Sequence, residues 1–200
     1  MLPEIIFKYS WIYDNGYRES KRIQAFLDKK GKKYPSPQKI ENYIKRVEPI
    51  WKNEEKKILT ELSRISGLEW KVKEISCYVI GVGRPFSDPL TLHIEKNYDD
   101  FIDILTHELI HQLFTQERNM QRSEKAWDYF FKKYKIESRT TKIHIPLHAI
   151  HAELIKRFYG EKRIGKRLQI PPHRDYKRSW EIVQKEGYKN ILYEFRKRIR

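Results

Sequence analysis

Cysteine and long apolar runs are nearly absent from this chain of 200 residues. The single cysteine, Cys77, excludes an internal disulfide framework and fits a reducing compartment, where we expect it to be a buried core thiol. No apolar run approaches the roughly 20 residues that cross a bilayer, and the first residues do not form a secretory signal. Internal repeats and low-complexity tracts are also lacking. We therefore predict a cytoplasmic protein with no membrane contact and a single domain over 1–200.

Acidic residues are scarce relative to basic ones. The chain has 27 Asp and Glu against 42 Lys and Arg, which gives a formal net charge of +15 at pH 7. Such an excess favours contact with an anionic partner such as nucleic acid. The simpler interpretation is a highly charged, solvated surface. Hydrophobic residues make up 39% of the chain, which is enough to build a core and excludes global disorder.

Hydrophobic spacing predicts a mainly helical α+β fold with a small mixed β-sheet. The segment 5–13 reads as a strand or an extended segment, and further strands are expected over 75–82 and 90–94. The strand over 90–94, if it lies at the sheet edge, could pair with an extended peptide through its main chain. Helices are expected over 18–30, 37–66, from about 99 onward, 121–134, 146–160 and 175–200, with a basic, proline-containing loop over 160–175. The domain core then covers about 70–160, between an N-terminal helical extension and a basic C-terminal one.

The helix expected from about residue 99 contains the pattern H-E-x-x-H, formed by His107, Glu108 and His111. Two histidines four residues apart lie about 40° apart around a helix and one turn along it, so both can reach one tetrahedral Zn²⁺. Glu108 lies where its carboxylate can reach a water on the metal rather than the metal itself. The alternative is two satisfied core histidines and a surface glutamate. Because the helix is apolar on most of its surface, buried polar side chains there need partners, and a metal supplies one.

A third ligand is needed, because a catalytic zinc takes three protein ligands and keeps one position open. His144, His148 and His151 lie within eight residues of one another. Pro146 suits the first position of a helix, so His148 is expected in its first turn, His151 near its apolar stripe and His144 outside the helix. The alternative is that these are ordinary core or surface histidines.

This arrangement resembles the gluzincins, the thermolysin-like zinc metallopeptidases. In that family a helix some tens of residues after H-E-x-x-H carries a glutamate ligand in its first turn, commonly followed by small and apolar residues. The segment His148-Ala149-Ile150 occupies that place, although it offers His for the usual Glu, and Ala152 replaces the family's following carboxylate. The resemblance covers about 70–160 and implies a zincin-like fold and a Zn²⁺ held by His107, His111 and His148.

The sequence therefore favours a zinc-dependent metallopeptidase, a hydrolase that acts on peptides or proteins with Glu108 as general base. His151 is a possible outer partner or an alternative ligand. The donor that stabilises the oxyanion stays open among His144, His151, Tyr159 and His173. Two other functions also stay open: a basic nucleic-acid-associated protein with a structural metal, and a regulatory, partner-binding protein on a metallopeptidase fold.

Overall fold

The computed structural model describes residues 1–160, 162–164 and 173–200, so most of the loop predicted over 160–175 lies outside the described residues. The described chain is mainly helical with a small mixed sheet, which confirms the predicted α+β class. Residue contacts divide it into two compact units. We call Leu2–Lys57 with Val72–Leu109 the N-terminal unit, and Ile58–Lys71 with Ile110–Arg200 the C-terminal unit. No described helix is long and apolar enough to cross a membrane.

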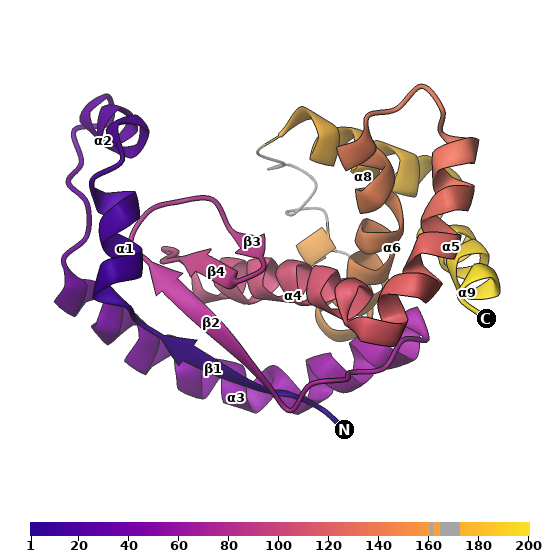
Figure 1. The fold of residues 1–200 in the computed structure, drawn as a ribbon, viewed down its shortest axis with the longest axis horizontal. Coiled ribbons are helices and arrows are strands. Elements are labelled where there is room, and N and C mark those ends of the chain that lie inside the picture. The colour runs from indigo at the N-terminus through magenta and orange to yellow at the C-terminus, as the bar shows by residue number, and fades with distance from the viewer. Residues whose placement is uncertain (161, 165–172) are drawn as a thin grey trace. The chain divides into compact units, whose positions relative to one another are not determined.

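The sheet belongs to the N-terminal unit and has the strand order β1-β2-β4-β3 (Figure 1). Its strands are β1 (Glu4–Lys8), β2 (Glu74–Ile80), β3 (Phe86–Ser87) and β4 (Leu90–His93). β1, β2 and β4 are parallel, and β3 runs antiparallel to β4. β4 is therefore not an edge strand, so the condition set for its pairing with an extended peptide is not met. On the side of β4 that β2 leaves open, Phe86 and Ser87 of β3 pair with Thr91 and Leu90.

Helices cover the rest of the N-terminal unit. They are α1 (Trp11–Arg18), α2 (Lys21–Asp28), α3 (Pro37–Ser66) and α4 (Tyr98–Thr115), and the last two continue into the C-terminal unit. The Phe101 ring of α4 lies 5.8 Å from Phe7 of β1 and 5.4 Å from Tyr43 of α3, between ring centroids. Strand and helices thus share one core. Pro49 lies inside α3 without ending it.

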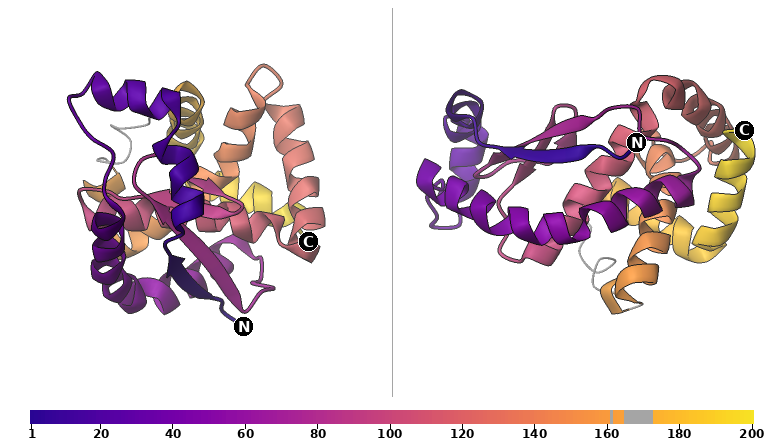
Figure 2. Two further views of the ribbon diagram at one scale, coloured as in Figure 1. Left: turned by 60° about the vertical axis from the view of Figure 1, so that its left-hand side comes forward. Right: turned by 90° about the horizontal axis from the view of Figure 1, so that it is seen from below.

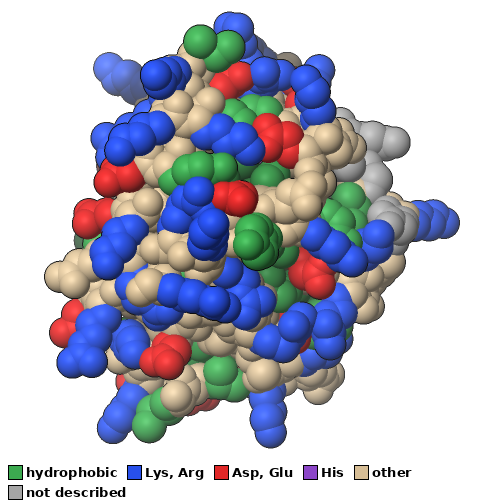
Figure 3. Space-filling view, turned by 90° about the vertical axis from the view of Figure 1, so that its right-hand side faces the viewer, with side chains coloured by type: hydrophobic (Ala, Val, Ile, Leu, Met, Phe, Trp, Pro, Cys, Tyr) green, Lys and Arg blue, Asp and Glu red, His purple; other side chains and the backbone are tan. Residues whose placement is uncertain are grey.

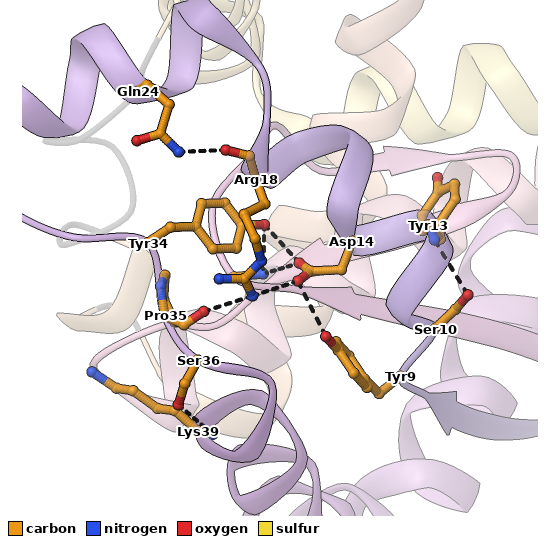
Figure 4. Close-up of polar contacts among 11 residues, drawn as sticks. Tyr9, Ser10, Tyr13, Asp14, Arg18, Gln24, Tyr34, Pro35, Ser36 and Lys39 are labelled. Atoms are coloured by element: carbon orange, nitrogen blue, oxygen red, sulfur yellow. Dashed lines mark hydrogen bonds and ion pairs between the residues drawn. The ribbon is translucent and has the colours of Figure 1, made fainter.

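A buried carboxylate ties α1 to the sheet (Figure 4). Asp14 is fully buried. Its oxygens accept hydrogen bonds from Arg18 Nη2 at 3.0 Å, Tyr34 OH at 2.6 Å, the Gly81 N–H at 3.0 Å and Tyr9 OH at 3.3 Å. Burial, followed by the hydrogen bond to Asp14, raises the pKa of Tyr34, so this hydroxyl stays a donor. Four donors therefore depend on one side chain, and they come from α1, the residues before it, the segment between α2 and α3, and the end of β2.

Replacing Asp14 should destabilise the protein strongly. Asp14→Ala removes the partner of Arg18, and breaking a buried ion pair typically costs about 3–5 kcal/mol of unfolding free energy. The exposed Asp28 at the end of α2 offers a matched control, and Asp28→Ala should change stability by less than about 0.5 kcal/mol. Urea unfolding followed by circular dichroism measures both. Equal stability of the two variants would contradict the structural role of Asp14.

The C-terminal unit is helical around α6, which contacts α5, α8 and α9 (Figures 1 and 2). These helices are α5 (Glu117–Lys133), α6 (Arg139–Tyr159), α8 (Arg174–Glu186) and α9 (Tyr188–Arg198). α8 and α9 meet at Gly187, whose φ of 80° suits glycine, so the helical segment expected over 175–200 is divided into two helices. The Phe114 ring at the end of α4 lies 5.4 Å from Phe195 of α9. The end of α4 is therefore part of this core.

Helix α6 begins seven residues earlier than the sequence pattern indicates. Ser138 caps it, because the Ser138 hydroxyl accepts the Thr141 N–H at 3.0 Å. Pro146 then lies in the helix interior. The predicted start at Pro146, with His144 outside the helix, is therefore wrong. The correction places His144, His148 and His151 at i, i+4 and i+7 on one face of a single helix.

Candidate metal centre

Helix α4 presents His107 and His111 from successive turns, as the sequence predicts. The division between the two units falls inside α4, but the helix itself is continuous from Tyr98 to Thr115. His107 and Glu108 are only 6% and 5% exposed. Leu105, Leu109 and Leu113 are fully buried, so the apolar surface expected of this helix is part of the core. His107 and Glu108 thus lie inside the protein and not on its surface.

Helix α6 adds His144. The Nε2 atoms of His144 and His111 are 3.2 Å apart, and the two rings meet edge to face. On the other side of the ring, His144 Nδ1 lies 2.7 Å from the Thr140 carbonyl oxygen. A carbonyl oxygen only accepts, so Nδ1 carries the proton and Nε2 presents its lone pair. Metal-binding histidines are commonly held in this way, with the second ring nitrogen donating to a carbonyl or carboxylate.

His107, His111 and His144 form a group that could hold a metal ion. One nitrogen from each ring lies within 4.8 Å of the other two. Zinc–nitrogen bonds of about 2.1 Å in a tetrahedron place two nitrogens roughly 3.4 Å apart, and the observed 3.2 Å between His111 and His144 is close to that spacing. Imidazole also suits copper, iron and nickel, so the spacing is compatible with a bound metal ion but does not select which metal.

The residue that sequence reasoning chose as third ligand, His148, is not in this group. Its Nδ1 lies 2.7 Å from the hydroxyl of Ser179, which itself donates to the Tyr176 carbonyl at 2.9 Å. Because the Ser179 hydroxyl gives its proton to that carbonyl, it accepts the hydrogen bond from His148, and His148 Nδ1 is the donor. The His148 ring also stacks on Trp180, with centroids 4.3 Å apart and planes 11° apart. Helix α8 thus holds His148 through Ser179 and Trp180.

The other residues considered as oxyanion donors have different surroundings. His151 is fully buried, with its ring centroid 6.3 Å from that of Trp180. Tyr159 ends α6 and packs under Arg163, whose guanidinium carbon lies 4.0 Å from the ring centroid. His173 caps α8 through the Asp175 N–H and is half exposed. Neither Tyr159 nor His173 belongs to the histidine group.

Burial keeps His111 and His144 in the neutral form that binds metals. It lowers the pKa of His111 to about 3, with a smaller effect from the charge of a protonated His144. Burial also lowers the pKa of His144, against the opposing effect of the Thr140 carbonyl. No proton therefore has to leave these rings at neutral pH for a metal to bind.

The Cys77 thiol is buried and its pKa is raised by burial and by the Glu108 charge, which fits the predicted core role.

A pocket of about 450 Å³ opens beside His111 and His144, within the C-terminal unit. Its apolar lining comes from Met120, Trp127 and Phe131 of α5 and Ile143 of α6. Carboxylates of α5 and an arginine of α6 complete it, namely Glu124, Asp128 and Arg139. Sequence reasoning missed this role of α5, although its lining residues recur at spacings of three and four.

His144 also had a signal in the sequence. Ser138 is a favoured helix N-cap residue, and a start there puts His144 on the helix.

Comparison of the chain with protein-family models, with curated proteins and with solved structures gives no match.

Proposed function

We propose that this protein is a zinc-dependent metallopeptidase of zincin-like type, with His107, His111 and His144 as the metal ligands. The observation that carries the proposal is the approach of three imidazole nitrogens to within 4.8 Å of one another. Glu108 follows the first of these histidines on the same helix. His144 takes the place that sequence reasoning gave to His148, because its Nε2 lies beside that of His111.

The residues divide the chemistry between them. A bound zinc would supply a water whose pKa is lowered toward about 7. Glu108 would serve as the general base, accepting the proton of the attacking water and returning it to the leaving amine. The Thr140 carbonyl holds His144 in the tautomer and orientation of a ligand. Ser179 and Trp180 hold His148 one turn further along α6, in an outer position.

The pocket favours a catalytic site over a purely structural one. Structural zinc sites are closed by four protein ligands, whereas catalytic sites keep a position for water and substrate. Here two of the three histidines line a pocket of about 450 Å³, within the usual size of ligand sites. Its apolar and aromatic walls suit one large side chain of a peptide. An anionic group at Glu124 and Asp128 would be repelled, so the pocket favours apolar or cationic side chains.

Metal content and hydrolysis together test the proposal. Purified protein should contain about one zinc per chain, as a three-ligand site requires, and should cleave unfolded casein. Chelation should stop cleavage and lower the melting temperature, because a ligand held at 100 times its dissociation constant contributes about 2.7 kcal/mol. Zinc should restore both. Absence of any bound transition metal after metal-supplemented expression, by elemental analysis, would rule the proposal out.

A further inference from the structure

The C-terminal unit contains a second hollow, which is lined mainly by basic side chains. It has a volume of about 640 Å³ and lies along α9, beside the last turn of α3 and the middle of α6. Its lining carries one carboxylate, Glu153, and five cations: Arg64, Lys189, Arg196, Lys197 and Arg200. We call this hollow the basic groove. None of the three candidate metal ligands lines it.

The cations of α9 are available to a partner. Lys189, Arg196 and Lys197 are exposed, and no ion pair joins them to a carboxylate within the part of the chain that the structure describes. They recur at spacings of seven and eight residues, so they share one face of the helix. Arg198, by contrast, turns to Glu194 at 2.5 Å and to the Tyr129 ring. The free cations thus gather on the groove side of α9.

Arg64, which lines the groove, is paired with Glu61 on the preceding turn of α3. Glu61 binds Arg64 through both carboxylate oxygens at 2.5 to 2.9 Å, and Arg157 Nε lies 3.0 Å from the same carboxylate. The hydrogen bond from Arg64 lowers the pKa of Glu61, so the carboxylate stays charged and paired. Two arginines against one glutamate still leave a positive excess. Figure 3 shows the face of the molecule that carries α5 and α9, on which Lys and Arg far outnumber Asp and Glu.

An exposed aromatic ring stands among these cations. Tyr193 lines the groove and is 64% exposed, whereas its α9 neighbours Leu192 and Phe195 are buried. Lysines and arginines that follow a backbone, interleaved with an aromatic ring on which a base can stack, are the pattern of single-strand binding. From Lys189 to Lys197 the helix rises about 12 Å, the length of roughly four nucleotides at about 3.4 Å each. A membrane surface would require a row of exposed large apolar side chains, and α9 exposes Tyr193 alone.

We propose that the basic groove binds single-stranded nucleic acid, with the α9 cations on the phosphates and Tyr193 stacked on a base. Binding of this kind follows the charge of the backbone and depends little on base sequence. The groove and the histidine group share no residue, so the proposal stands whether or not the protein is a peptidase.

Fluorescence anisotropy with a labelled twelve-nucleotide oligothymidylate tests the proposal. With four phosphate contacts, from the three α9 cations and from Arg200 beyond the end of α9, wild-type affinity should fall about 50-fold between 50 and 200 mM salt. The combined variant Lys189→Gln, Arg196→Gln, Lys197→Gln keeps one contact, so its affinity should fall only about threefold over that range. At 50 mM salt it should bind at least about tenfold more weakly than wild type. Tyr193→Ala should lose about tenfold and Tyr193→Phe should retain binding, because the ring provides the stacking face.

A matched control removes the same charge elsewhere. Lys21, Arg22 and Lys29 are exposed at α2 and its end, and Lys21→Gln, Arg22→Gln, Lys29→Gln should bind within about threefold of wild type. Equal weakening of the two triple variants would overturn the groove assignment. Tighter binding of a twelve-base-pair duplex would overturn the single-strand assignment. Equally tight binding of polyglutamate, or of vesicles of anionic lipid, would overturn the assignment to nucleic acid.

Discussion

Glu108→Gln should abolish peptide hydrolysis while the protein keeps its zinc. Glutamine preserves the size of the side chain and can still hydrogen-bond, but it cannot take a proton from water. General-base catalysis contributes about 10²- to 10⁴-fold, so kcat should fall by that factor. Cleavage of a quenched fluorescent peptide gives the rate, and elemental analysis of the same preparation gives the zinc content.

A glutamate far from the histidines provides the control for this change. Glu74 is exposed at the start of β2, and Glu74→Gln makes the same chemical change without reaching the candidate centre, so it should leave kcat unaltered. Full activity of Glu108→Gln would show that another group is the base. Loss of zinc from Glu108→Gln would instead make Glu108 a ligand, and the role assigned to it would have to change.

His144→Ala should be isolated largely without zinc, whereas His148→Ala should retain it. His144 Nε2 lies 3.2 Å from His111 Nε2, inside the histidine group, while His148 is held by Ser179 and Trp180. Loss of an outer partner typically costs about 10- to 100-fold in metal affinity or activity. We expect the loss of a ligand to exceed that range. Competition with a fluorescent zinc chelator measures the affinity of each variant.

Folding must be checked beside this measurement, because both histidines are buried. Circular dichroism of His144→Ala should match that of the chelator-treated wild type, so that a missing ligand is separated from a collapsed fold. The opposite result, with zinc lost from His148→Ala and kept by His144→Ala, would restore the ligand set implied by the gluzincin resemblance. If both variants lost zinc affinity to the same extent, His144 and His148 would both be ligands of the metal.

Local patterns in the sequence were sufficient for much of this protein. The helix α3 was predicted over its full length, because Gly67 ends a long run of helical spacing. The relation between His107 and His111 also follows from the sequence, since a helix places residues four apart on one face whatever surrounds it. The strands β2 and β4 were predicted within a few residues of their observed ends, because the spacing of side chains along a strand is also a local pattern. Each of these features depends on neighbours along the chain.

Pairing between distant segments was decided by the tertiary structure alone. Nothing local in 90–94 reveals that β4 has partners on both sides, because strand order depends on which segments meet. The basic groove likewise needs α9 to lie beside the last turn of α3, whose residues are more than a hundred positions away.

The third histidine shows the same limit most clearly. Pro146 and Ser138 both favour the start of a helix. The prediction from the sequence placed the start at Pro146, whereas in the folded chain Ser138 caps α6. With the longer helix, His144, His148 and His151 share one face, so spacing cannot distinguish them. Composition and motif therefore determined that a metal site was expected on α4. The contact between His111 and His144, 33 residues apart, selected the third member, because only packing of the end of α4 near α6 brings those two nitrogens together.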